Sequence, residues 1–148
     1  MEKIILQTDG GSRGNPGPAG AGVVIFNKRG EVLKKTSSFL GTMTNNEAEY
    51  KAVILGLDTL KKIYGKEKIK NLEVEVRLDS ELVCRQLNGE YQIKEEKLVP
   101  LFVRVWNLHV ADFKKLRFFH IPREQNVEAD KLANEAMDQG KKEQSGLF

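Results

Sequence analysis

Hydrophobic and polar positions along the chain predict three consecutive strands near the N-terminus. Short apolar runs at 3–8, 21–26 and 31–40 are bounded by Gly, Asn and Pro, which is typical of strands. The first run ends at Asp9-Gly10-Gly11, so we expect a glycine- and proline-rich loop over 10–20. Short connections of this kind favour antiparallel pairing of the three strands.

After these runs the pattern changes to helical. Glu49, Val53, Leu57 and Leu60 share one face of a helix predicted over 44–64. Thr44-Asn45-Asn46-Glu47 forms a capping box for the start of this helix. Apolar and charged residues then alternate at the period of a strand. The later elements are expected in the order strand, helix, helix, strand, helix, at 72–78, 80–87, 98–110, 116–121 and 126–137.

This order predicts an α/β fold with one five-stranded mixed sheet flanked by helices, three strands being antiparallel and two parallel. A chain of 148 residues suits one domain, which we expect over 1–138. The apolar face of the last predicted helix ends at Met137, so a polar, frayed tail is expected over 139–148.

Composition excludes several classes of protein. No apolar run approaches the roughly 20 residues of a membrane helix, and the N-terminus lacks a signal-peptide pattern. Cys84 is the single cysteine, which excludes internal disulfides and a cysteine-based zinc site and favours a cytosolic location. The net charge of +3, from 24 basic and 21 acidic residues, is too small to identify a partner.

The glycine-rich segment 10–22 does not match a phosphate-binding loop. No Lys-Ser or Lys-Thr follows its glycines, and Gly20-Ala21-Gly22 leads into a strand instead of a helix. Two interpretations stay open. The segment is either a bent connection between strands or a loop whose small residues let a polynucleotide backbone approach closely.

Four carboxylates stand at positions where metal-site chemistry and a purely structural role are both possible. Asp9 and Asp79 each end a strand. Asp9 also suits a turn, and Asp79 also suits a supporting role beside Ser80, the predicted N-cap of the next helix. Asp130 begins the last helix, where an acid favours the helix dipole. Glu49 lies on the apolar face of its helix, where a carboxylate needs a partner such as a cation unless it reaches solvent at the edge.

If the first and fourth strands are parallel neighbours, Asp9 and Asp79 emerge from the same edge of the sheet. Several carboxylates crowded there repel one another unless cations neutralise them. Hard oxygen ligands suit Mg²⁺ or Mn²⁺, often as a pair about 4 Å apart, and such pairs act on phosphodiesters. The sequence thus raises the hypothesis of a metal-dependent site for nucleic acid.

Four segments stand out in order over residues 7–134: TDGGSRGNPGPAGAG, TNNEAEYKAVILGL, LDSELVCRQLNG and HIPREQNVEADKLAN. They resemble the successive motifs of type 1 ribonuclease H, in particular a shorter, archaeal-like subgroup that lacks a basic protrusion. The resemblance implies an RNase H-like fold and cleavage of the RNA strand of RNA/DNA hybrids by a monomer. It further implies two Mg²⁺ ions, with Mn²⁺ as substitute, one activating water and the other stabilising the departing 3′ oxygen. The products would carry 5′-phosphate and 3′-hydroxyl ends.

Carried over residue by residue, the resemblance assigns the site. The metal-binding carboxylates would be Asp9, Glu49, Asp79 and Asp130, and Asn126 would start the last helix. Substrate contacts would come from Gly10, Gly11, Asn15, Thr44, Asn45 and Asn46. For the auxiliary role near the last acid, Arg123 is favoured over His120, which we place within the fifth strand.

Two departures from the family pattern bear on affinity. Glu81 stands where several relatives have a polar amide. The segment that would hold the basic protrusion contains Lys94 and Lys97 but also Glu90, Glu95 and Glu96, so we expect weaker hybrid binding with a modest salt dependence. The alternatives are a non-catalytic module that binds hybrids or duplexes, and a nuclease on this fold that acts on DNA or branched junctions.

Overall fold

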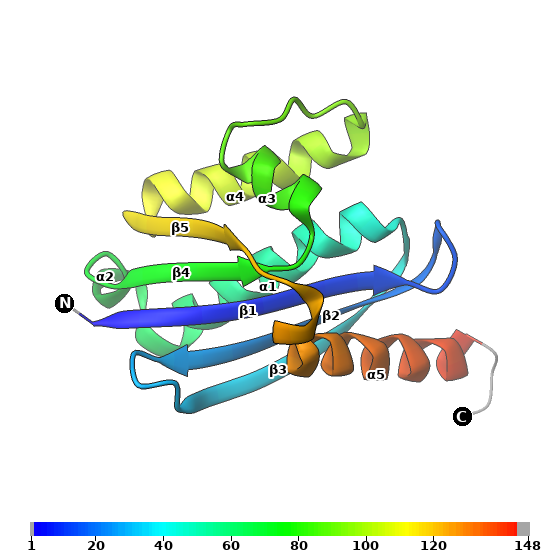
Figure 1. The fold of residues 1–148 in the computed structure, drawn as a ribbon, viewed down its shortest axis with the longest axis horizontal. Helices are drawn as coiled ribbons and strands as arrows, with labels where there is room; N and C mark the ends of the chain where they lie inside the picture. Colours follow the sequence, from blue (N-terminus) through cyan, green and yellow to red (C-terminus); the bar gives the residue numbers. More distant parts are fainter. Residues whose placement is uncertain (1, 145–148) are drawn as a thin grey trace.

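The computed structural model describes residues 2–144, which form a five-stranded sheet with helices on both faces (Figure 1). The strands are β1 (Lys3–Ser12), β2 (Gly17–Asn27), β3 (Val32–Met43), β4 (Glu73–Leu78) and β5 (Lys115–His120). The helices are α1 (Asn45–Tyr64), α2 (Lys66–Ile69), α3 (Glu81–Leu87), α4 (Val99–Ala111) and α5 (Val127–Gln144), with short 3-10 turns η1 (Glu96–Leu98) and η2 (Arg123–Gln125).

The strand order β3-β2-β1-β4-β5 confirms the predicted mixed sheet. Strands β1, β2 and β3 pair antiparallel, whereas β1 pairs with β4, and β4 with β5, in parallel. Thr8 lies opposite Leu78 in the β1–β4 register. Asp9 and Asp79 are the next residues, so they lie side by side where the β1–β4 pairing ends, as the sequence predicted. The prediction that Asp9 ends its strand is wrong, because β1 continues to Ser12 in its pairing with β2.

Helix α1 lies behind the sheet in Figure 1 and α5 in front of it. Both helices contact β1 and β2. Thr44 caps α1 with a capping box: its side chain accepts a hydrogen bond from the Glu47 amide, and Glu47 reaches back to the Thr44 amide. Ser80 caps α3 by accepting from the Val83 amide. These two caps start the helices at the positions that the sequence predicted.

The expected loop over 10–20 is wrong, because most of it is strand. β1 continues through Ser12 and β2 begins at Gly17, which leaves only residues 13–16 as the turn. The glycines serve close packing instead of a loop. A Cβ on Gly10 would overlap the backbone of Ala48 in α1, and one on Gly22 would lie 2.7 Å from the Ala133 amide nitrogen in α5.

The predicted C-terminal end of the last helix is also wrong. α5 continues to Gln144, past the expected end near Met137. Gly140 explains the continuation, since it lies against the Phe39 ring of β3, where any side chain would collide. The helix therefore still packs on the sheet beyond residue 138, and residues 145–148 of the expected tail lie outside the described part of the chain.

The main core lies between α1 and the sheet, where Ile4, Leu6, Val23, Val53 and Leu57 are fully buried. Between residues 2 and 144, no helix is long and apolar enough to cross a bilayer.

Candidate active site

Three carboxylates from three different elements meet at the edge of the sheet. Asp9 comes from β1, Asp79 directly follows β4, and Glu49 lies in the second turn of α1. One oxygen from each lies within 4.8 Å of the other two. The parallel β1–β4 register brings the two aspartates together, and the Thr44 cap beside β1 brings the N-terminal turns of α1 to the same place.

Burial makes this cluster electrostatically unfavourable as three bare anions. Asp9 and Glu49 are each only 7% exposed, and Glu49 Oε2 is a buried atom without a hydrogen-bond partner. Burial, with the charge of Asp79, raises the pKa of Asp9 to about 7. Burial, with Asp9 as neighbour, also raises the pKa of Glu49 well above its ordinary value.

A hard divalent cation fits this arrangement. The donor set of the cluster is made of oxygen atoms, and Glu49 has a buried oxygen that no hydrogen bond satisfies. A bound cation would relieve the repulsion that raises both pKa values. The donor chemistry therefore supports a metal site at Asp9, Glu49 and Asp79.

Asp130 lies beside the cluster and not within it. It lies in the first turn of α5 and lines the same cavity of about 430 Å³ as the three other carboxylates. Its hydrogen bond and its charge both act to raise the pKa of Asp9. The four predicted carboxylates are thus gathered in one cavity, with three in close contact and the fourth at the side.

Asn126 ties the elements of the site together. Its buried amide nitrogen donates to the Thr8 carbonyl at 2.9 Å and to Asp79 Oδ2 at 3.2 Å. The side chain therefore links the start of α5 to the middle of β1 and to the residue that follows β4. Sequence analysis placed Asn126 at the helix start, but only the fold reveals that it orients Asp79.

The predicted substrate residues divide into two groups. Gly10, Gly11, Asn45 and Asn46 line the cavity with the carboxylates. Asn15 and Thr44 have structural partners instead. Asn15 Oδ1 accepts from the Asn45 amide at 3.0 Å, and Thr44 caps α1.

The two candidates for the auxiliary role also differ in position. Arg123, in η2, lines the cavity. His120 is the exposed last residue of β5 and does not belong to the cavity lining. This placement favours Arg123, although both roles stay predictions.

Sequence analysis missed several residues around the cavity, notably Ser12, Arg13 and Asn134. Arg13 donates to Asn134 Oδ1 at 3.0 Å and forms an ion pair with Asp138 at 2.8 Å. The sequence did offer a signal for Asn134. Asp130, Asn134 and Asp138 are spaced four residues apart, which places their side chains on one face of α5.

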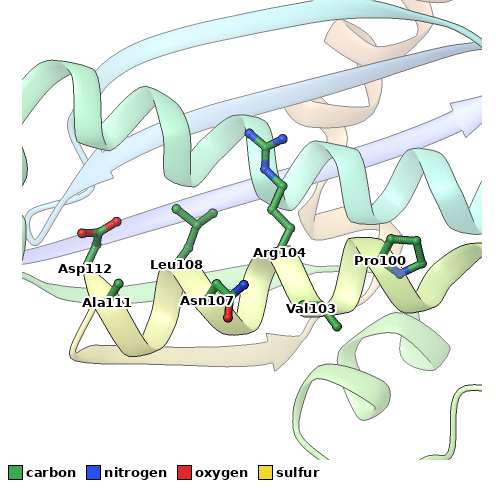
Figure 2. Close-up of a pocket in the computed structure, with 7 residues that line it drawn as sticks. All are labelled: Pro100, Val103, Arg104, Asn107, Leu108, Ala111 and Asp112. Carbon is green, nitrogen blue, oxygen red and sulfur yellow. The ribbon is translucent and has the colours of Figure 1, made fainter.

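A second hollow, of about 420 Å³, lies along α4 (Figure 2). Figure 2 shows Arg104 reaching toward the neighbouring helix, where it pairs with Asp58 of α1 at 2.8 Å. At the far end of α4, Asp112 pairs with Lys61 of α1 at 2.7 Å. These pairs join two helices, and the carboxylates of the sheet edge are not part of this hollow.

Fold and acidic edge together define the class of RNase H-like proteins: a mixed sheet whose adjacent parallel strands bring carboxylates to one cavity. Residues 7–136 match the family described as Reverse transcriptase-like. LC11-RNase H1, isolated from compost by a metagenomic approach, is 48% identical, with a TM-score of 0.88 over 94% of this chain and 98% of that chain. The chain belongs to the type 1 ribonuclease H family.

Two further relatives are similar over most of this chain. Ribonuclease HI of Halobacterium salinarum is 38% identical over 88% of this chain and 62% of its own length. Bifunctional protein Rv2228c of Mycobacterium tuberculosis is 39% identical over 92% of this chain. The chain spans only 36% of the length of that mycobacterial relative.

Proposed function

We propose that this chain is an endoribonuclease that hydrolyses the RNA strand of RNA/DNA hybrids, leaving 5′-phosphate and 3′-hydroxyl ends. The observation that carries the proposal is the cluster of Asp9, Glu49 and Asp79, whose oxygens lie within 4.8 Å of one another. The similar LC11-RNase H1 has been solved in complex with an RNA/DNA hybrid, which supports the choice of substrate.

The four carboxylates would hold two Mg²⁺ ions, or Mn²⁺ as substitute. Such ions, when bound, lower the pKa of water and neutralise charge that develops on phosphate oxygens. Asn126 would keep Asp79 in position through its hydrogen bond at 3.2 Å. Arg123, on the wall of the cavity, would add positive charge near the scissile phosphate.

The chain's other cavity residues suit a duplex. Gly10 and Gly11 line the cavity with their backbone, which a sugar-phosphate strand can contact. Asn45 and Asn46 offer amide groups at the first turn of α1. Since a hybrid displays its 2′-hydroxyls in a wide minor groove, polar groups at this wall can distinguish RNA from DNA.

All of these residues belong to one chain, which supports a monomeric enzyme. Gel filtration with light scattering would test that proposal. A cytosolic location is proposed as well, on the strength of the single cysteine in the sequence.

The direct test is cleavage of an end-labelled RNA/DNA hybrid with Mg²⁺ by the wild type, by Asp9→Asn and by Asp58→Asn. Asp58 pairs with Arg104 away from the cavity, so its variant is the matched control. We expect the wild type and Asp58→Asn to cut the RNA strand, and Asp9→Asn to lose at least about a hundredfold in rate.

Other outcomes would assign the fold a different function. Binding of the hybrid without cleavage in Mg²⁺ or Mn²⁺ would favour a non-catalytic binding module. Faster cleavage of duplex DNA or a four-way junction would favour a different nuclease. A hybrid cut equally well by the wild type and Asp9→Asn would contradict the assignment of the site.

A further inference from the structure

Asn46, one of the residues proposed to meet the hybrid, already has a charged partner. Its Nδ2 donates to Glu95 Oε1 at 2.8 Å, across 49 positions of sequence. Asn46 lies in the first turn of α1 and lines the cavity of the four carboxylates. Glu95 lies just before η1, in the segment that connects α3 to α4. The contact therefore joins the connecting segment to the wall of the site.

The connecting segment provides little positive charge to offset Glu95. Arg85 of α3 is held by Glu81 at 3.7 Å and by Glu90 at 3.1 Å. Glu95 and Glu90 both line a hollow of about 500 Å³ between this segment and α3, together with Lys94. Residues 81–97 contain four acids and three bases, so this side of the site faces a polyanionic substrate with a slight negative charge.

Two physical effects of Glu95 act in the same direction. A phosphate, a base edge or a 2′-hydroxyl that accepts from this Asn46 donor has to displace a charge-assisted hydrogen bond. A carboxylate at hydrogen-bond distance from the contact point also repels a nucleic-acid phosphate placed there. Both effects weaken binding of the hybrid, and neither touches the carboxylate cluster that would carry the chemistry.

We propose that Glu95 is an affinity-setting residue that accepts from the Asn46 amide in the free protein and is displaced when the hybrid binds. This inference rests on the proposed function, because it assigns Asn46 to the substrate. Glu95 then sets the affinity for hybrid and leaves the chemical step unaltered.

Three variants separate charge from hydrogen bonding. Glu95→Gln keeps an oxygen that can accept from Asn46 but removes the charge, and Glu95→Ala removes both. Glu96→Gln is the matched control, because Glu96 is the neighbouring acid and has no hydrogen bond to Asn46 in the described structure. Thermal melts of all variants check that each one folds.

Steady-state cleavage of the hybrid gives KM and kcat separately for each variant. The Kd for the same hybrid is measured in EDTA by fluorescence anisotropy. We expect Glu95→Ala to lower KM and Kd about three- to tenfold, the range that the net contribution of one typical exposed hydrogen bond gives. The KM and Kd of Glu95→Gln should lie between those of Glu95→Ala and the wild type. Glu96→Gln should change KM less than about twofold. In all variants, kcat should stay within about twofold of the wild-type value.

Ionic strength and a double variant provide two further tests. Raising the ionic strength from about 0.05 M to about 0.3 M should remove the gain of Glu95→Gln and leave part of that of Glu95→Ala. In an Asn46→Ala background, Glu95→Ala should act no more strongly than Glu96→Gln.

The inference is overturned if Glu95→Ala leaves KM and Kd unchanged or raises them, or if Glu96→Gln lowers them equally. A wild type that cuts no hybrid would refute the proposed function separately. The Kd comparison between Glu95→Ala and Glu96→Gln would still decide the role of Glu95 in that case.

Discussion

At the scale of single residues, buried charge identifies the site. A carboxylate on the apolar face of a helix, such as Glu49, is costly without a partner, and the fold supplies two more carboxylates instead of a base. The sequence could identify Glu49 because its helical position is a local property. The neighbours that raise its pKa come from other elements, so they were visible only as a hypothesis.

The raised pKa of Asp9 predicts an unusual pH dependence for the metal-free protein. Its value rises from an ordinary 3.8 to about 7, so between these values the folded state holds a proton that the unfolded state has released. Stability from this group is therefore present at acid pH and is lost as the pH rises through about 7. In EDTA at about pH 8, Asp9→Asn should raise the free energy of unfolding by up to about 4 kcal/mol, since a rise of about three pKa units at about 1.4 kcal/mol each sets the upper bound.

Urea melts of the wild type and Asp9→Asn in EDTA at about pH 5 and pH 8 measure this effect. The gain of the variant should be clearly larger at the higher pH. Mg²⁺ should then stabilise the wild type more than the variant, because it binds the ionised carboxylates. A gain that is independent of pH would contradict the electrostatic explanation.

The choice between Arg123 and His120 is also decided at single residues. Arg123 lines the cavity whereas His120 does not, so Arg123→Ala should lower kcat about tenfold or more and His120→Ala far less. Steady-state cleavage of a hybrid under Mg²⁺ compares the two. The reverse order of effects would transfer the auxiliary role to the histidine.

At the scale of elements, glycine decides how closely helices approach the sheet. The sequence suggested a loop because Gly and Pro usually interrupt strands, yet the pairing of Gly10 with Ala21 and of Gly11 with Gly20 continues the β1–β2 ladder. Local propensity was overridden by packing, since α1 and α5 need a sheet surface free of side chains at these points.

Gly22→Ala tests this explanation. The new Cβ would lie 2.7 Å from the Ala133 amide nitrogen and 2.8 Å from Leu132 Cβ, so α5 would have to shift. We expect a loss of roughly 1–3 kcal/mol in the free energy of unfolding, as in other overpacked cores. Because α5 carries Asp130, hybrid cleavage should fall as well.

Gly11→Ala is the control for stability, because its Cβ would meet Met137 Cε at an ordinary 3.4 Å and no atom more closely. Thermal denaturation should separate the two variants clearly. Equal stability of both would contradict close packing as the reason for Gly22.

At the scale of the whole molecule, the site is assembled by topology. The three clustered carboxylates stand 40 and 30 residues apart along the chain, as Asp9, Glu49 and Asp79. They meet because β1 and β4 are parallel neighbours in the middle of the sheet and α1 starts beside them. The cavity that they line opens at that edge, where ligands bind in sheets of this kind.

The sequence by itself determined the order of strands and helices, the caps at Thr44 and Ser80, and the unusual position of Glu49, because periodicity and capping are local properties of a segment. Only the tertiary structure decided which strands are neighbours, that Asn126 orients Asp79, and that Glu95 holds Asn46. Those contacts join segments tens of residues apart, and the packing that selects them belongs to no single segment.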